Sequence, residues 1–250
     1  MIRLSVNVNK VATLRNSRGG RVPSVLEAVD VCVAAGAPGI TVHPRADRRH
    51  ITPDDVRAIA RTLRAGGPGV KIELNVEGDP RPELLDLVDE VRPDQCTLVP
   101  VVPGEVTSQA GWQPGPDSDR LPAVVARLKA VGIRVSLFVD AEPGPIQWAA
   151  SAGADRVELY TGPFARAFEH GPDVARRSFA HYAEAARLAY ARGLAVNAGH
   201  DLDLANLVLF RDLPFLAEVS IGHAILSRAL FAGLPTVVRE YLDVLERRER

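Results

Sequence analysis

The sequence predicts an α/β fold of the (β/α)8 class, a TIM barrel with extra helices, in a single domain over residues 1–250. The length of 250 residues matches one such domain. The stronger observation is a series of eight short runs rich in Val, Ile or Leu, the number of strands that closes this barrel. The expected strands are Arg3–Asn9, Gly39–His43, Lys71–Glu77, Gln95–Pro100, Arg134–Asp140, Arg156–Thr161, Ala195–Gly199 and Glu218–Gly222.

Helical patterns alternate with these strands, and several begin with Pro or with a Ser, Thr or Asp that can cap the first turn. The expected helices are Ser24–Ala35, Pro53–Arg64, Pro82–Val91, Leu121–Val131, Pro145–Ala152, Asp173–Arg192, Leu204–Arg211 and Ala224–Glu246. Glycines stand between a helix and the next strand, where a left-handed cap is expected, at Gly36, Gly132, Gly153 and Gly193.

The alternation predicts parallel strands with right-handed crossovers. The main rival is a doubly wound open sheet, which usually has fewer strands in this length. No Gly-x-Gly-x-x-Gly follows the first strand, so a dinucleotide-binding fingerprint is absent.

Charge and cysteine content narrow the class of protein. The formal net charge of −1 at pH 7 argues against nucleic acid or an anionic membrane as the principal partner. Cys32 and Cys96 fall in different expected elements, so we expect no disulfide and a reduced, cytoplasmic setting. The first residues do not read as a secretory leader, and no apolar stretch approaches the roughly 18 residues of a membrane span.

Histidines stand at or just beyond the ends of expected strands. His43, His50, His200 and His223 follow apolar runs, and the carboxyl ends of barrel strands meet on one rim. Any one of them could be a structural histidine. As a set near Glu residues, however, they predict proton-transfer chemistry on that rim.

Carboxylates accompany the histidines. Glu73, Asn75 and Glu77 share one face of an expected strand, and burial of two carboxylates there would raise a pKa and make a base usable near neutrality. Glu77 is the better candidate because it lies nearer the carboxyl end, although Glu73 stays open. Glu158 stands alone in an apolar run and is either functional or a buried partner of an Arg or Lys.

Two other chemistries fit less well. A zinc site could use the same His and Glu residues, but no HExxH or tight His-x-His spacing occurs, and we expect no metal. A Ser-His-Asp hydrolase lacks its Gly-x-Ser-x-Gly motif.

Anion binding is expected at two places on the rim. Basic residues follow the first two strands, and the backbone amides at Gly199 and Gly222 precede helical segments. Two separate anion-binding sites indicate two phosphorylated reactants or one bisphosphate. The long connections at 101–120 and after Thr161 would overhang this rim, and the first is a candidate lid.

Ordered motifs along nearly the whole chain resemble the pyridoxine 5′-phosphate synthase family. They are SVNVNKVATLRNSRG (5–19), GITVHPRADRRHIT (39–52), NVEG (75–78), VELYTG (157–162), VNAGHDL (196–202) and EVSIGHAI (218–225). The resemblance implies a barrel with extra helices, a homo-octamer, and no metal or organic cofactor. It also implies that 1-deoxy-D-xylulose 5-phosphate condenses with 3-amino-2-oxopropyl phosphate to give pyridoxine 5′-phosphate, phosphate and water.

The resemblance also implies roles for individual residues. His43 and Glu77 correspond to proton acceptors, His200 to the proton donor, and Glu158 to a residue that stabilises a transition state. Contacts to the aminoketone phosphate are implied for Asn7, Arg18, Gly222 and His223. Contacts to the deoxyxylulose phosphate are implied for Arg45, His50 and Thr107.

Three positions depart from the family pattern but are still expected to bind substrate. Asn9 and Lys10 replace a common Asp-His pair, which changes charge and pH response. Asp201 stands where Gly is common. A different phosphate-handling barrel, such as an aldolase or epimerase, and a non-catalytic binding barrel remain alternatives.

Overall fold

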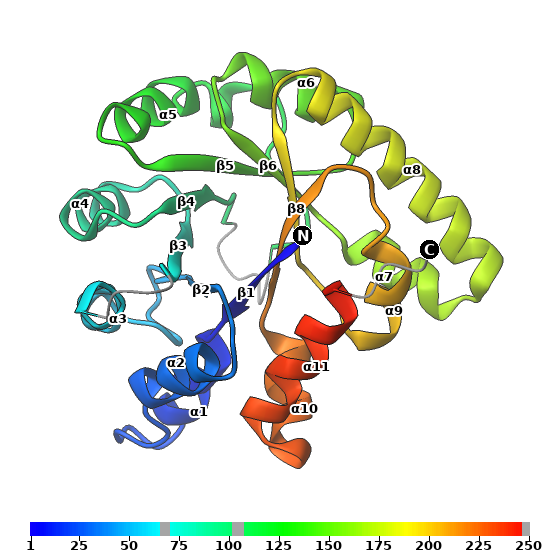
Figure 1. Ribbon diagram of the computed structural model, residues 1–250. Coiled ribbons are helices and arrows are strands. Elements are labelled where there is room, and N and C mark those ends of the chain that lie inside the picture. Colours follow the sequence, from blue (N-terminus) through cyan, green and yellow to red (C-terminus); the bar gives the residue numbers. More distant parts are fainter. Residues whose placement is uncertain (66–70, 102–107, 247–250) are drawn as a thin grey trace.

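The strands close into the predicted barrel. In the computed structural model, which describes residues 1–65, 71–101 and 108–246, eight parallel strands pair in chain order and the last pairs with the first (Figure 1). They are β1 (Arg3–Asn7), β2 (Gly39–Val42), β3 (Glu73–Gly78), β4 (Gln95–Leu98), β5 (Arg134–Val139), β6 (Arg156–Leu159), β7 (Ala195–Ala198) and β8 (Leu216–Ile221).

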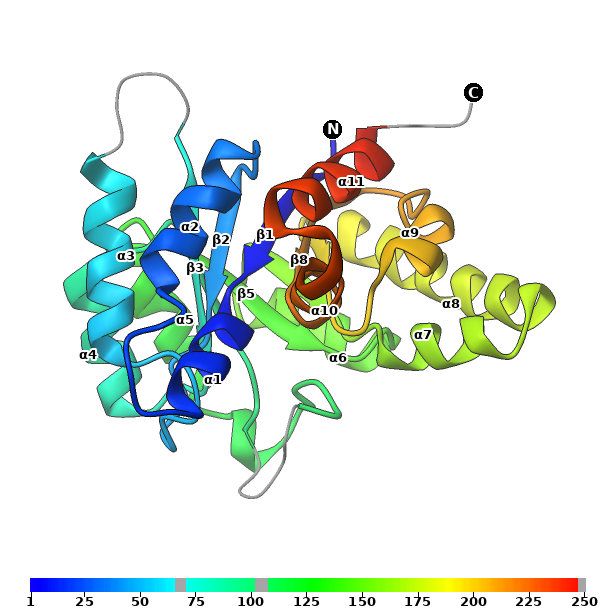
Figure 2. The same cartoon turned by 90° about the horizontal axis from the view of Figure 1, so that it is seen from below.

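Helices form a ring around the strands (Figure 1). They are α1 (Asn9–Asn16), α2 (Val25–Ala34), α3 (Pro53–Ala65), α4 (Pro82–Val91), α5 (Leu121–Ala130), α6 (Pro143–Ser151), α7 (Gly162–Glu169), α8 (Pro172–Ala191), α9 (Leu204–Phe210), α10 (His223–Ala232) and α11 (Leu234–Glu246), with a 3-10 turn at Pro116–Ser118. Figure 2 shows α1 at one end of the barrel and the N-terminus at the other. Because β1 runs between them, α1 marks the end of the barrel where the strands finish.

Several expected bounds differ from the observed ones by a few residues, and three differences change the local structure. The first expected strand ends early, because the Asn7 side-chain carbonyl accepts from the Asn9 amide at 3.0 Å and the chain turns into α1. The connection after Thr161 contains α7. The long C-terminal helix is divided into α10 and α11 at Gly233, whose φ of 82° is unfavourable for other residues.

Local capping signals were predicted correctly. The Ser24 hydroxyl accepts from the Glu27 amide at 3.3 Å at the start of α2. The glycines that precede strands all have positive φ, as expected for left-handed caps, at Gly36, Gly132, Gly153 and Gly193.

The interior of the barrel is polar, and the apolar core lies between strands and helices. Gln95 Nε2 on β4 donates to Glu218 Oε1 on β8 at 3.4 Å, although these strands are not neighbours. Such a contact is possible only across the interior. Barrels of this class usually fill that space with branched apolar residues. Here the apolar side chains alternate outward, as with Leu4 and Val6 on β1, both fully buried in the main hydrophobic cluster.

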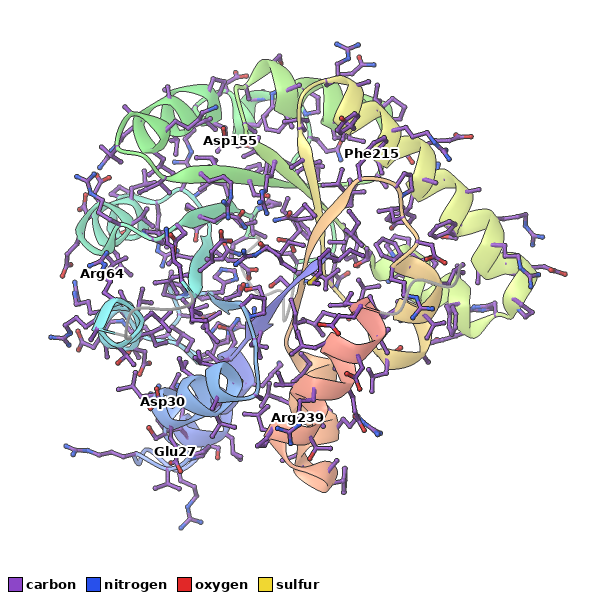
Figure 3. The ribbon with its side chains drawn as sticks, viewed as in Figure 1. Glu27, Asp30, Arg64, Asp155, Phe215 and Arg239 are labelled. Carbon is purple, nitrogen blue, oxygen red and sulfur yellow. The ribbon has the colours of Figure 1, made fainter. Side chains whose placement is uncertain are left out.

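Charged side chains populate the outside of the helical ring. Figure 3 shows Glu27 and Asp30 on α2 and Arg239 on α11 on its outer side, where all three are exposed. Across the described ranges, none of the helices combines the length and apolar character needed to cross a membrane.

Candidate active site

A cavity of about 580 Å³ opens at the carboxyl ends of the strands. It gathers residues from strands far apart in the sequence, including every expected site residue except Arg18 and Thr107. The expected residues that line it are Asn7, Asn9, Lys10, His43, Arg45, His50, Glu77, Glu158, His200, Asp201, Gly222 and His223.

The two exceptions differ in kind. Arg18 is exposed just beyond the end of α1 and does not line the cavity. Thr107 lies outside the described residues, as does part of the expected lid at 101–120. Substrate contacts by both residues stay predictions.

Glu77 lies near the end of β3 and is only 6% exposed. Its oxygens accept from Asn7 Nδ2 and Ser220 Oγ, both at 3.4 Å, and His43 Nδ1 is 4.0 Å from Oε2. Burial raises its pKa to about 8, and the negative charge of Glu218 acts in the same direction against the Ser220 hydrogen bond. Glu77 can therefore take up and release a proton near neutral pH.

Glu158 enters the cavity from β6 and is 3% exposed. Its Oε2 has no hydrogen-bond partner among the described residues, and no described Lys or Arg forms an ion pair with it. Burial, followed by the charges of Glu77 and Glu218, holds its pKa well above the ordinary value. The alternative that Glu158 is the buried partner of a cation is therefore wrong for these described residues.

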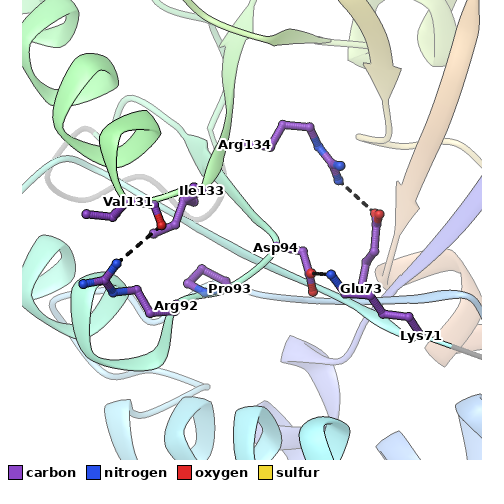
Figure 4. A pocket seen from close by; sticks show the side chains of 9 residues that line it. Lys71, Glu73, Arg92, Pro93, Asp94, Val131, Ile133 and Arg134 are labelled. Carbon is purple, nitrogen blue, oxygen red and sulfur yellow. Dashed lines mark hydrogen bonds and ion pairs between the residues drawn. The ribbon is translucent and has the colours of Figure 1, made fainter. Parts of the chain in front are cut away.

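Glu73 belongs to the opposite end of the barrel. Four residues along a strand separate it from Glu77 by about 13 Å. Its Oε2 accepts from Arg134 Nη2 at 2.8 Å beside a separate hollow where Lys71 pairs with Asp94 (Figure 4). The structure therefore does not bring Glu73 into the cavity with Glu77.

Three histidines in the cavity, His43, His50 and His200, have lowered pKa values that favour the neutral ring at pH 7. Burial is the main cause that lowers the pKa of His43, of His50 (to about 4) and of His200. The His43 and His50 rings have centroids 6.1 Å apart. The His200 ring packs against Phe138 and Tyr160, with centroids 4.9 and 5.9 Å away, which fixes its plane.

A basic corner lies on one side of the cavity. Lys10, Arg45, Arg49 and His50 line it, and the charges of Arg45 and Lys10 contribute to the low pKa of His50. Arg45 is 7% exposed, and its Nε lies 3.6 Å from Asp47 Oδ2 in an ion pair. This corner suits a phosphate group. Arg49 is one of the basic residues that follow the second expected strand.

A second corner is built from glycines at the ends of β7 and β8. A Cβ at Gly222 would lie 2.8 Å from the carbonyl oxygen of Asn7, and one at Gly199 would lie 2.2 Å from that of Ser220. Gly222 also precedes His223, the first residue of α10, and the first N–H groups of a helix have no acceptor within the helix and can bind an anion. Only glycine lets the backbone approach this closely.

Asn9 and Asp201 have backbone roles that the sequence did not reveal. The Asn9 side-chain oxygen accepts from the His43 amide at 2.9 Å and so joins α1 to the end of β2. Asp201 has a φ of 62°, in the left-handed region, which explains why glycine suits this position.

Sequence reasoning missed Ser220 and Glu218, which lie on the inner face of β8. Both are two-residue steps back from Gly222, so the strand period could have found them. Within residues 1–65, 71–101 and 108–246, no group of three or more His, Cys, Asp or Glu side chains is arranged to hold a metal ion.

Comparison with known proteins places the chain in a family. A family model described as Pyridoxal phosphate biosynthesis protein PdxJ matches residues 4–247. Pyridoxine 5′-phosphate synthase of Leptospira biflexa serovar Patoc is 49% identical over 253 residues, covering 98% of this chain and 97% of the relative. The enzyme of the same name from Xanthomonas oryzae pv. oryzae is 51% identical over 252 residues, covering 98% and 96%.

Solved structures with low identity share the fold. Phosphoribosyl anthranilate isomerase from Thermotoga maritima has a TM-score of 0.61 at 14% identity, covering 98% of this chain and 99% of that one. Thiamine phosphate pyrophosphorylase from Pyrococcus furiosus has a TM-score of 0.61 at 14% identity, covering 98% and 96%. The family model and the close relatives decide the assignment: the chain belongs to the PdxJ family of pyridoxal phosphate biosynthesis proteins.

Proposed function

We propose that this enzyme of vitamin B6 biosynthesis, a pyridoxine 5′-phosphate synthase, condenses 1-deoxy-D-xylulose 5-phosphate with 3-amino-2-oxopropyl phosphate. The products are pyridoxine 5′-phosphate, inorganic phosphate and water. The observation that carries this proposal is one cavity that holds His43, Glu77, Glu158 and His200 between a basic corner and a glycine corner. Two anion-binding corners suit two phosphorylated reactants.

The reaction requires protons to move at several atoms. An amine and a ketone form an imine with loss of water, one phosphate leaves, and ring closure and dehydration complete the aromatic ring. Several acid and base groups around one cavity serve these steps better than one nucleophile does. Burial of the groups also protects the imine from water.

We assign proton acceptance to His43 and Glu77. Their 4.0 Å separation lets both reach neighbouring atoms of one bound molecule, and both side chains are buried away from bulk water. The raised pKa of Glu77 gives it the proton affinity of a base that works near neutrality.

We assign proton donation to His200 and transition-state stabilisation to Glu158. A neutral imidazole can accept a proton at one ring nitrogen and donate from the other, and the aromatic rings beside His200 hold it in one plane. Glu158 has an oxygen without a partner among the described residues, so it can meet a developing positive charge or donate a proton when protonated.

The phosphates are assigned to the two corners. The basic corner, with Arg45 and His50, would hold the deoxyxylulose phosphate, with Thr107 added from the resemblance. The glycine corner, with Asn7, Gly222 and His223, would hold the aminoketone phosphate, with Arg18 added on the same basis. Lys10 belongs to the basic corner, and Asn9 and Asp201 also line the cavity. We further propose a cytoplasmic homo-octamer that needs no metal or organic cofactor.

The test is direct synthesis. The purified chain is mixed with both substrates, and inorganic phosphate and pyridoxine 5′-phosphate are measured together. We expect one phosphate released for each pyridoxine 5′-phosphate formed, and no product when either substrate is omitted. Folded wild-type protein that releases no phosphate from the complete mixture would overturn the proposal.

A further inference from the structure

Glu218 is a buried carboxylate that the assigned roles leave unused. It lies on the inner face of β8, is 4% exposed, and shares the barrel interior with Glu77 on β3 and Glu158 on β6. Although it does not line the cavity itself, it contributes to the electrostatic environment of both carboxylates that do.

The contacts of Glu218 support a negative charge on it. Arg156 Nη1 lies 3.2 Å from Glu218 Oε2 in an ion pair whose side chains are 13% and 5% exposed. Gln95 Nε2 and Asn197 Nδ2 donate to Oε1 at 3.4 and 3.5 Å. Arg156 also donates to Asn197 Oδ1 at 3.0 Å, so the ion pair is held in place from β7 as well.

Glu77 and Glu158 have weaker support for a negative charge. Glu77 accepts two long hydrogen bonds from neutral groups, and the nearby His43 has a lowered pKa. Glu158 has an oxygen without a partner among the described residues. A single guanidinium contact does not stabilise three negative charges in a poorly solvated interior. The carboxyl groups with weaker contacts, those of Glu77 and Glu158, therefore hold their protons more strongly.

Other titratable groups face this cluster from the surrounding elements and must be accounted for. Burial raises the pKa of Glu218 above its ordinary value, and the ion pair with Arg156 opposes that shift. From the opposite end of the barrel, Glu73 raises the same pKa, whereas Arg134 and Arg3 lower it. Cys96 on β4 belongs to the main hydrophobic cluster, and burial raises the pKa of its thiol to about 12, so it stays neutral. Among the residues that the structure describes, neither Glu77 nor Glu158 forms an ion pair with a Lys or Arg side chain.

We propose that Glu218 is a positioning residue for the reaction: its ion pair with Arg156 fixes a negative charge below the cavity and so raises the proton affinity of Glu77 and Glu158 before substrate binds. The proposal rests on the proposed roles of those two residues. The charge of Glu218 acts after burial in raising the pKa of both. When that charge is removed, the two carboxyl groups ionise at lower pH. Glu77 then has a lower proton affinity and is a weaker base.

The first test needs no substrate. The infrared band of protonated carboxyl groups is titrated with pH in the wild type, in Glu218→Gln and in Glu73→Gln, with Glu77→Gln and Glu158→Gln used to assign the band. In Glu218→Gln, we expect the midpoint of its loss to fall by about one pH unit or more. Glu73→Gln removes an interior carboxylate at the far end and should not lower the midpoint.

A double variant distinguishes loss of the Glu218 charge from the effect of leaving Arg156 unpaired. Glu218→Gln leaves Arg156 without its carboxylate, and the freed guanidinium would itself favour ionisation of its neighbours. Glu218→Gln with Arg156→Gln removes both charges, also avoids an unpaired buried cation if the single variant does not fold, and should still lower the midpoint. An unchanged midpoint in the folded double variant overturns the proposal.

Kinetics supply the second readout. The pH at which kcat/KM reaches half its plateau should move down in Glu218→Gln in step with the infrared midpoint, whereas a purely structural role would lower the rate at every pH alike. A kinetic midpoint that stays in place while the infrared midpoint moves overturns the link to catalysis. An infrared shift in protein that makes no pyridoxine 5′-phosphate leaves the charge coupling standing and overturns the proposed function instead.

Discussion

His43 Nδ1 lies 4.0 Å from Glu77 Oε2 at the ends of two adjacent strands, and both residues are less than 10% exposed. The pairing of β2 with β3 fixes this separation through the backbone. One bound substrate can therefore exchange protons with both groups without movement of the barrel.

Glu77→Gln should lower kcat by about 100-fold or more, because general acid–base groups typically contribute at least that factor. The substitution keeps the size of the side chain, so circular dichroism and the unfolding temperature should stay close to the wild type. Glu73→Gln is the matched control on the same strand and should keep kcat within a few-fold. A near-wild-type rate for Glu77→Gln would remove it from the mechanism.

The pH dependence of kcat/KM should be set by Glu77 on the acid side. A proton acceptor works only when ionised, and burial raises the pKa of Glu77 to about 8. We therefore expect kcat/KM to rise about tenfold per pH unit below that value and then level off. Initial rates between pH 6 and 9 measure this profile. A plateau that already begins at pH 6 would contradict the assignment.

The free energy of unfolding should also depend on pH through the raised pKa of Glu77. The folded-state pKa of Glu77 lies above its ordinary value of 4.5, so the native state holds a proton that the unfolded chain releases. Its contribution to the free energy of unfolding therefore falls as pH rises from about 5 to about 8, by up to about 1.4 kcal/mol per pH unit. The buried histidines, whose pKa values are lowered, act with opposite sign below about pH 6.5.

The histidine contributions cancel when Glu77→Gln is compared with the wild type at each pH. Urea unfolding should show that the variant gains stability relative to the wild type as pH rises from about 5 to about 8. A difference that does not change with pH would show that Glu77 titrates normally in the folded protein.

Arg45→Ala should raise the KM for 1-deoxy-D-xylulose 5-phosphate by about 10- to 100-fold, the loss expected for one or two charge-assisted hydrogen bonds. The KM for the aminoketone phosphate should change much less. Arg48→Ala is the matched control, because Arg48 is exposed on the same loop and does not line the cavity. Equal effects of Arg45→Ala on both substrates would place both phosphates in one corner.

Gly199→Ala should lower the free energy of unfolding by about 2 kcal/mol or more, because the new methyl group would meet the backbone carbonyl of Ser220 at 2.2 Å. Gly144→Ala is the control, since a Cβ there meets nothing within 4 Å. Chemical unfolding of both variants measures the difference. Equal stabilities would mean that β7 and β8 can separate at this point without cost.

Local sequence signals predicted the barrel well. Each expected strand is present, because a run of β-branched and apolar residues between turn signals needs no distant information. The helices α1 and α7 were not predicted, because they are short, at eight residues each, and lie where the barrel pattern predicts loops. Packing against the rim, which the chain order does not reveal, decides their conformation.

The site was predictable only in part. The strand period placed Glu77 inward and near the rim, but spacing alone left Glu73 as an alternative that the ion pair with Arg134 now explains. The resemblance, rather than the residue pattern, supplied the roles of individual side chains. Glu218 remained unrecognised because its partners Arg156 and Gln95 come from other strands and meet it only when the barrel closes.

The two faces of the sheet have different roles: the outer face packs in the hydrophobic core, and the inner face carries the polar residues. The hydrophobic contacts that stabilise the fold form a sleeve outside the strand cylinder, where Leu4, Ile40 and Leu98 pack against helices. The lumen contributes little apolar burial, so exchanges of its residues that keep charges and hydrogen bonds paired remove few hydrophobic contacts. New acid–base chemistry could thus be tried inside this scaffold while the sleeve is kept intact.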